Sequence, residues 1–119
     1  MNDLQNEFIR QSAADLRSLA EKSHRYKNAN LPDSLLSEIF RALHTVKGTS
    51  QVFGLLIPAG LAHTLENVLT AAKSTALSPE DLKMLLPEGL EILAQTLTEK
   101  DFQIPVSFNQ KIQNHQSDS

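Results

Sequence analysis

Apolar residues recur every three or four positions along most of this chain, and no segment alternates apolar and polar residues with a period of two. A three- to four-residue spacing places apolar side chains along one face of an α-helix. The pattern therefore predicts four amphipathic helices, over residues 3–27, 32–53, 59–74 and 78–100. Because the connections between them are short, we expect the helices to run antiparallel and to bury their apolar faces against one another.

Capping signals mark most of the predicted helix ends. Asp3 is expected to cap the first helix, and Pro32 suits the first turn of the second, where a backbone N–H would have no partner. Gly54 suits a left-handed residue just after the second helix. Ser78 with Asp81 three residues later resembles a capping box and marks the start of the fourth helix.

The end of the chain is less regular than its beginning. Pro87 and Gly89 lie inside the fourth helical pattern and predict a kink or a short break there. Residues 103–119 hold scattered apolar side chains followed by polar ones, so we expect a docking segment, with room for a short C-terminal helix, and a flexible tail or linker. The predicted fold is all-α, an antiparallel up-and-down four-helix bundle over residues 1–102.

Composition and charge exclude several functional classes. A chain of 119 residues is expected to form one domain, and its net charge of −3, without a Lys/Arg-rich run, argues against nucleic acid as a partner. The absence of cysteine removes thiolate metal sites and fits a cytoplasmic location. Neither a signal peptide nor an apolar run of about 18 residues is present, so no membrane association is expected. The bundle needs no second copy to bury its apolar faces, which favours a monomer.

One group of candidate functional residues lies on the second predicted helix. His44 falls at the edge of the apolar face, where its imidazole is accessible, and Lys47 and Gly48 follow three and four residues later on the same surface. Glycine in a helix interior costs roughly 0.5–1 kcal/mol relative to alanine. Its missing Cβ would let a phosphoryl group and a partner approach the ring, and Lys47 would supply a mobile cation to the phosphoryl oxygens.

A second group lies on the third predicted helix, where His63 and Glu66 are three residues apart beside the apolar face. Antiparallel packing of the second and third helices would bring them opposite His44. Glu66 would then accept a hydrogen bond from the Nδ1–H of His44. That contact would leave Nε2 as the nucleophilic nitrogen.

The run His44-Thr45-Val46-Lys47-Gly48, with Phe53-Gly54 downstream, resembles the phosphorylation motif of histidine phosphotransfer (Hpt) domains. The likeness extends over residues 8–100, and Leu61-Ala62-His63-Thr64-Leu65-Glu66 particularly resembles the N-terminal domain of chemotaxis-type histidine kinases. In that subgroup the phosphoacceptor histidine forms a hydrogen-bonded cluster with a lysine, a histidine and a glutamate. The resemblance implies these roles for His44, Lys47, His63 and Glu66.

The same resemblance implies a phosphoryl carrier rather than an enzyme, phosphorylated on Nε2 by a histidine kinase domain or by the phospho-aspartate of a response-regulator receiver domain. The partner would bring Mg²⁺ and the transfer machinery, so the chain itself is expected to need no cofactor. No Gly-rich nucleotide-binding loop occurs in the chain. Both a stand-alone phosphocarrier and a fragment of a larger kinase fit these observations.

Two other classes of function stay open at this point. One is a metal-binding bundle with His44, His63 and Glu66 as zinc ligands, since two imidazoles and a carboxylate can hold zinc, although Lys47 would place a cation beside the metal. The chain is alternatively a binding-only helical adaptor that keeps the fold without phosphoryl chemistry. Uptake of acid-labile phosphate separates the adaptor from the phosphocarrier.

Overall fold

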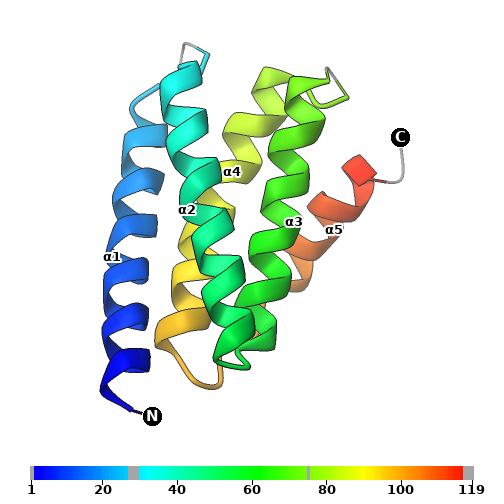
Figure 1. Ribbon diagram of the computed structural model, residues 1–119. Helices are drawn as coiled ribbons and strands as arrows, with labels where there is room; N and C mark the ends of the chain where they lie inside the picture. Colours follow the sequence, from blue (N-terminus) through cyan, green and yellow to red (C-terminus); the bar gives the residue numbers. More distant parts are fainter. Residues whose placement is uncertain (1, 27–29, 75, 117–119) are drawn as a thin grey trace.

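The computed structural model describes residues 2–26, 30–74 and 76–116, and within them it contains five α-helices and no strand (Figure 1). The helices are α1 (Asp3–His24), α2 (Asp33–Val52), α3 (Leu56–Lys73), α4 (Pro79–Thr98) and α5 (Val106–Gln116). None of the described helices is both long enough and apolar enough to span a bilayer. The first four helices correspond to the four that the apolar pattern predicts.

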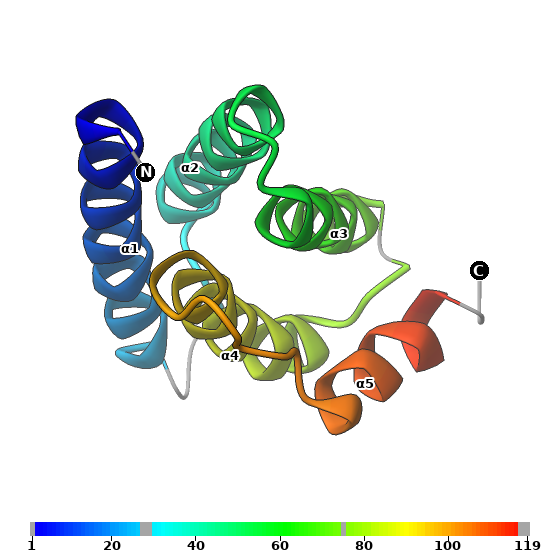
Figure 2. The ribbon, with the colours of Figure 1, turned by 90° about the horizontal axis from the view of Figure 1, so that it is seen from below.

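Helices α1 to α4 form a bundle around one core, as the view along its axis shows (Figure 2). Helix α1 packs against α2 and α4, and α3 packs against the same two helices from the other side. The predicted all-α, up-and-down four-helix bundle is therefore confirmed. The largest fully buried apolar side chains of these four helices are Leu16, Ile39, Leu43, Leu65, Leu85, Leu86, Leu90 and Leu93.

Most of the predicted helix ends are correct, but the cap of α1 is not. Asn2, rather than Asp3, caps this helix, because the Asn2 side chain accepts a hydrogen bond from the Gln5 backbone N–H at 2.8 Å. Gly54 has a φ of 72°, as expected of a left-handed residue after α2. Ser78 accepts from the Asp81 N–H at 3.1 Å, which confirms the predicted start of α4. Helix α1 ends at His24, and residue 27, its predicted end, lies outside the described residues.

Two prolines lie inside helices, where the sequence predicted a connection at one and a kink or break at the other. Pro58 was expected in a connection, yet it lies in the first turn of α3, where a missing N–H removes no intrahelical hydrogen bond. Helix α4 continues through Pro87 and Gly89, so a break there is wrong, and the alternative, a kink, stays a prediction. Gly89 serves helix packing instead, because a Cβ there would lie 2.5 Å from Leu65 Cδ2 on α3.

The segment after residue 102 forms a helix that packs against α4. Phe108 and Ile112 on α5 are buried, and Lys111 forms an ion pair with Glu88 on α4, with 3.3 Å between Nζ and Oε1. Helix α5 includes the polar residues up to Gln116, and residues 117–119 of the predicted flexible tail lie outside the described residues. The expected C-terminal helix is thus present on the outside of the bundle (Figure 2).

Candidate functional site

His44 lies in the middle of α2 and points away from the core. Its helix buries Ile39, Leu43 and Val46, so the neighbouring position 44 falls at the edge of the buried face. The imidazole side chain is 68% exposed. The structure therefore places the candidate phosphoacceptor where the sequence pattern predicts it, with access from solvent.

Glu66 on α3 faces His44 across the contact between α2 and α3. Its side chain is only 8% exposed, and Oε2 lies 3.1 Å from Nδ1 of His44. An ionised carboxylate can accept a hydrogen bond but cannot donate one, so the neutral imidazole carries its proton on Nδ1. The lone pair of Nε2 is then available to a reaction partner.

Lys47 also contacts Glu66, as the family resemblance implies, whereas the helix spacing alone predicted a mobile cation beside His44. Its Nζ lies 2.7 Å from Glu66 Oε1, and the lysine side chain is 22% exposed. Lys47 is therefore paired within the domain rather than free beside His44. Burial alone would raise the pKa of Glu66, but the hydrogen bonds and positive charges of Lys47 and His44 outweigh burial and hold the pKa below its ordinary value.

His63 lies at the border of this cluster. Its Nδ1 is 4.0 Å from Glu66 Oε1, which is too long for a hydrogen bond, and its ring is largely exposed. The structure thus brings the four candidates together at one place on α2 and α3, with Glu66 at the centre. His44 and Lys47 bind to the carboxylate directly, whereas His63 is only near it.

Gly48 provides open space beside the imidazole. A Cβ built at this position would have no heavy atom within 4 Å, so packing inside the domain does not require a glycine there. The same is true of Gly60 on α3, to which the sequence analysis assigned no role. Leu56 and Ile57 form the start of α3, although the sequence pattern predicted a connection there. Both are exposed apolar side chains.

The residues described give no support to a metal site. Among them, no group of three or more His, Cys, Asp or Glu side chains is arranged to hold a metal ion. The Lys47 ammonium also occupies the side of Glu66 on which His63 lies, since both approach Oε1. A cation at this place would repel a metal ion.

Comparison with known proteins gives one family and several relatives. The family model described as Hpt domain matches residues 3–99. Chemotaxis protein CheA of Bacillus subtilis is 38% identical over 74 residues, which cover 62% of this chain and 11% of that protein. Chemotaxis protein CheA of Listeria monocytogenes is 34% identical over 71 residues, covering 60% of this chain and 12% of that protein.

A more distant relative is similar over a longer stretch. Chemotaxis protein CheA of Rhizobium meliloti is 25% identical over 95 residues, which cover 79% of this chain and 12% of that protein. The matched part of the chain thus spans only about an eighth of the length of these relatives. No solved structure gives a significant match.

Proposed function

The chain belongs to the Hpt domain family, and we propose that it carries a phosphoryl group on Nε2 of His44 and exchanges it with an aspartate of a receiver domain. Hpt domains are the histidine phosphotransfer domains of phosphorelay systems, so the family supplies the class of reaction. The hydrogen bond between Nδ1 of exposed His44 and buried Glu66 supports the choice of residue. With this hydrogen bond, the imidazole is both accessible to a partner and held in one tautomer.

In the proposed transfer, the lone pair of Nε2 forms a bond to phosphorus while the bond from phosphorus to the donor oxygen breaks. The electron pair of the broken bond stays on the donor oxygen. The proton on Nδ1 is retained, and the imidazole becomes positively charged. Glu66, 3.1 Å from Nδ1, stabilises that charge. In the onward step a carboxylate oxygen of a receiver aspartate attacks phosphorus, and the N–P bond breaks.

The partners we propose are a histidine kinase domain and a response-regulator receiver domain. They would supply the nucleotide or the phospho-aspartate, the Mg²⁺ that neutralises phosphoryl charge, and the in-line geometry. The chain would contribute the nucleophile and the residues that orient it. The open space at Gly48 suits the close approach that such a transfer requires. We propose that the domain acts in the cytoplasm as a monomer.

The proposal is tested with an active chemotaxis-type histidine kinase or a phosphorylated receiver as donor. Wild type is expected to take up acid-labile, base-stable phosphate, and His44→Gln is expected to take up none. Because His44 is 68% exposed, this substitution should change the free energy of unfolding by less than about 0.5 kcal/mol. Circular dichroism and urea unfolding check that the variant is folded.

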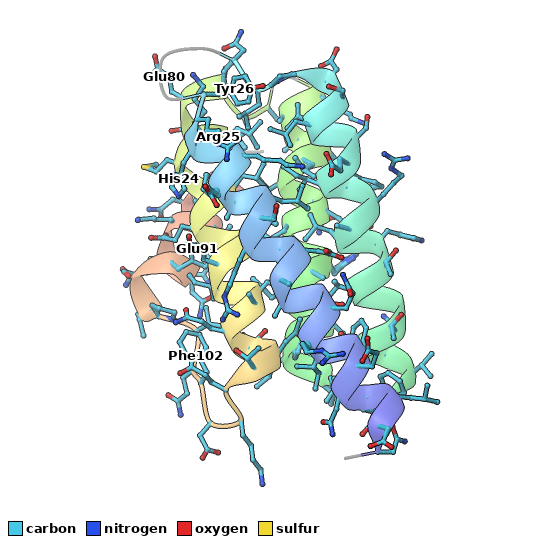
Figure 3. The ribbon with its side chains drawn as sticks, turned by 90° about the vertical axis from the view of Figure 1, so that its left-hand side faces the viewer. His24, Arg25, Tyr26, Glu80, Glu91 and Phe102 are labelled. Atoms are coloured by element: carbon cyan, nitrogen blue, oxygen red, sulfur yellow. The ribbon has the colours of Figure 1, made fainter. Side chains whose placement is uncertain are left out.

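The matched control is His24→Gln, which removes another exposed histidine, on α1 (Figure 3). This variant should take up phosphate like wild type. Full activity of His44→Gln would refute the assignment of His44. A folded wild type that takes no phosphate from several donors would favour the adaptor function instead.

A further inference from the structure

An apolar cavity lies at the end of the bundle opposite to the connection between α2 and α3. Figure 1 shows that these two helices diverge from their connection, and that the start of α4 lies behind them where they are farthest apart. The cavity has a volume of about 190 Å³ and is lined by the first half of α2, the last two turns of α3 and the start of α4. His44 and Glu66 do not line it, so it is separate from the candidate phosphoryl site.

The walls of this cavity set the size and the polarity of what it can hold. They are mainly apolar, with Leu36 and Phe40 from α2, Leu69 from α3 and Leu82 from α4. An apolar cavity of about 150 Å³ is large enough to hold benzene, whereas a drug-sized molecule needs roughly 300 Å³ or more. The cavity therefore has room for one six-membered ring, and the ring of Phe40 offers an aromatic surface for it.

One ammonium group lies beside the cavity. Lys73, in the last turn of α3, lines the cavity, and its Nζ lies 5.6 Å from the centre of the Phe40 ring on α2. The ion pairs formed between described residues do not include Lys73. Because Lys73 is exposed, its ammonium lies at the mouth of the cavity. The four-carbon stem is flexible, so the ammonium can turn from the ring to an anion held there.

Asp33 is the acidic group among the described residues that line the cavity. It lies in the first turn of α2, where the helix dipole stabilises its negative charge. Its short side chain has less reach than the side chain of Lys73, which already extends from α3 to the ring of Phe40 on α2. The mouth therefore favours an anion paired with Lys73 over a cation paired with Asp33.

We propose that this cavity binds a small aromatic carboxylate. Its ring lies among the apolar side chains of α2, α3 and α4, and its carboxylate pairs with Lys73. Because the occupant contacts three helices of the folded bundle, binding raises the stability of the fold. The inference does not depend on the phosphoryl chemistry proposed for His44.

Titration with 3-phenylpropanoate, followed by NMR of the methyl groups, tests the proposal. The signals of Leu36, Leu69 and Leu82 should shift and reach saturation. The neutral 3-phenylpropanamide should bind roughly two- to fivefold more weakly, which is the gain expected of one exposed ion pair. Methyl signals that stay unchanged up to about 20 mM 3-phenylpropanoate, a concentration well above a millimolar Kd, would overturn the proposal.

Substitutions at the mouth test the choice of a carboxylate. Lys73→Gln should remove the difference in Kd between the acid and the amide, whereas Asp33→Asn should tighten binding of the acid about twofold because a like charge is lost. Lys111→Gln is the control, since Lys111 pairs with Glu88 and does not line the cavity, and it should change neither Kd. A preference for the acid that persists in Lys73→Gln would overturn the pairing with Lys73.

A variant that fills the cavity tests the place of binding. Ala72 lines the cavity on α3, so Ala72→Leu should abolish binding of both probes. Ala14→Leu adds the same side chain at an exposed position of α1 and should bind them like wild type, as should His44→Gln, which separates this inference from the proposed function. Circular dichroism checks that each variant is folded. If wild type binds neither probe but Ala72→Leu slows phosphoryl uptake from a receiver domain, the cavity holds a side chain of that partner, and the proposal is wrong.

Discussion

His24 and His44 are both exposed residues on helices, but their surroundings differ. His24 on α1 lines an open polar groove together with Glu91 of α4, on the side of the bundle seen in Figure 3. His44 on α2 has a buried carboxylate 3.1 Å from Nδ1. A hydrogen bond at one ring nitrogen determines which tautomer the imidazole adopts. The nearby carboxylate, rather than exposure, distinguishes the candidate phosphoacceptor.

Glu66 should make the stability of the fold depend on acid pH. Burial raises its pKa, but the contacts with Lys47 and His44 outweigh burial, so the folded pKa lies below the ordinary 4.5. A carboxyl with a depressed folded pKa stabilises the fold above its unfolded pKa, and this contribution is lost as the pH falls through the folded pKa. We predict that Glu66→Gln lowers the free energy of unfolding by roughly 1–3 kcal/mol near pH 7. The difference from wild type should shrink at pH values below 4.5.

Urea unfolding at steps from about pH 7 to about pH 3 measures this difference. Glu38→Gln is the control, because Glu38 pairs with Lys22 at 3.5 Å on the exposed surface and should contribute little at any pH. A difference for Glu66→Gln that stays constant over the whole range would contradict the prediction.

At the scale of elements, α2 and α3 each carry an interior glycine that the packing of the domain does not require. A Cβ at Gly48 or at Gly60 would have no heavy atom within 4 Å. The two glycines differ in their distance along the helix from the pair His44 and Glu66, since Gly48 follows His44 by one turn, whereas Gly60 precedes Glu66 by six residues. This difference makes them a matched pair for testing access to the imidazole.

We predict that Gly48→Ala and Gly60→Ala each raise the free energy of unfolding by roughly 0.5–1 kcal/mol, because alanine favours the helix and meets no steric conflict. Gly48→Ala should also slow phosphoryl uptake roughly 10-fold, since its methyl group lies beside His44 and displaces the partner from its reacting geometry. Uptake by Gly60→Ala should be unchanged. Urea unfolding and initial rates of uptake measure the two effects.

Stabilisation without slower uptake in Gly48→Ala would show that access does not depend on this position. Equal slowing in both variants would show instead that the partner covers α3 as far as Gly60. Either result changes the expected contact surface of the partner. Neither affects the role of His44 as nucleophile.

At the scale of the whole molecule, α5 extends the bundle by a fifth helix. Phe108 is among its most buried side chains, and its ring approaches Gly89, where a Cβ would lie 3.1 Å from Phe108 Cζ. Among the described helices, the backbone of α5 comes close only to that of α4. It is thus held by the outer side of the bundle, away from the contact between α2 and α3. A domain boundary at residue 102 stays a prediction.

We predict that Phe108→Ala lowers the free energy of unfolding by about 3 kcal/mol, because a buried aromatic side chain is replaced by a cavity. Phosphoryl uptake should be unchanged at temperatures where the variant is folded, since within the described residues the backbone of α5 approaches α4 and neither α2 nor α3. Val106→Ala, at an exposed position of the same helix, is the control and should change stability by less than about 0.5 kcal/mol. Equal effects of the two substitutions would mean that α5 adds no stability.

The sequence by itself determined the features that depend on neighbours along one helix. The apolar spacing predicted four helices and the bundle, and it placed His44 at an exposed edge with Lys47 and Gly48 beside it. These features are predictable because the helix has a fixed number of residues per turn. Capping by Ser78 and the left-handed Gly54 were predictable for the same local reason.

Only the tertiary structure decided which side chains meet across helices. It paired Lys47 with Glu66, left His63 Nδ1 at 4.0 Å from Glu66 Oε1, and placed Gly89 where Leu65 and Phe108 approach the backbone of α4. These outcomes depend on the rotation and depth of one helix against another. The packing of the whole core sets both, so the pattern along a single helix does not contain them.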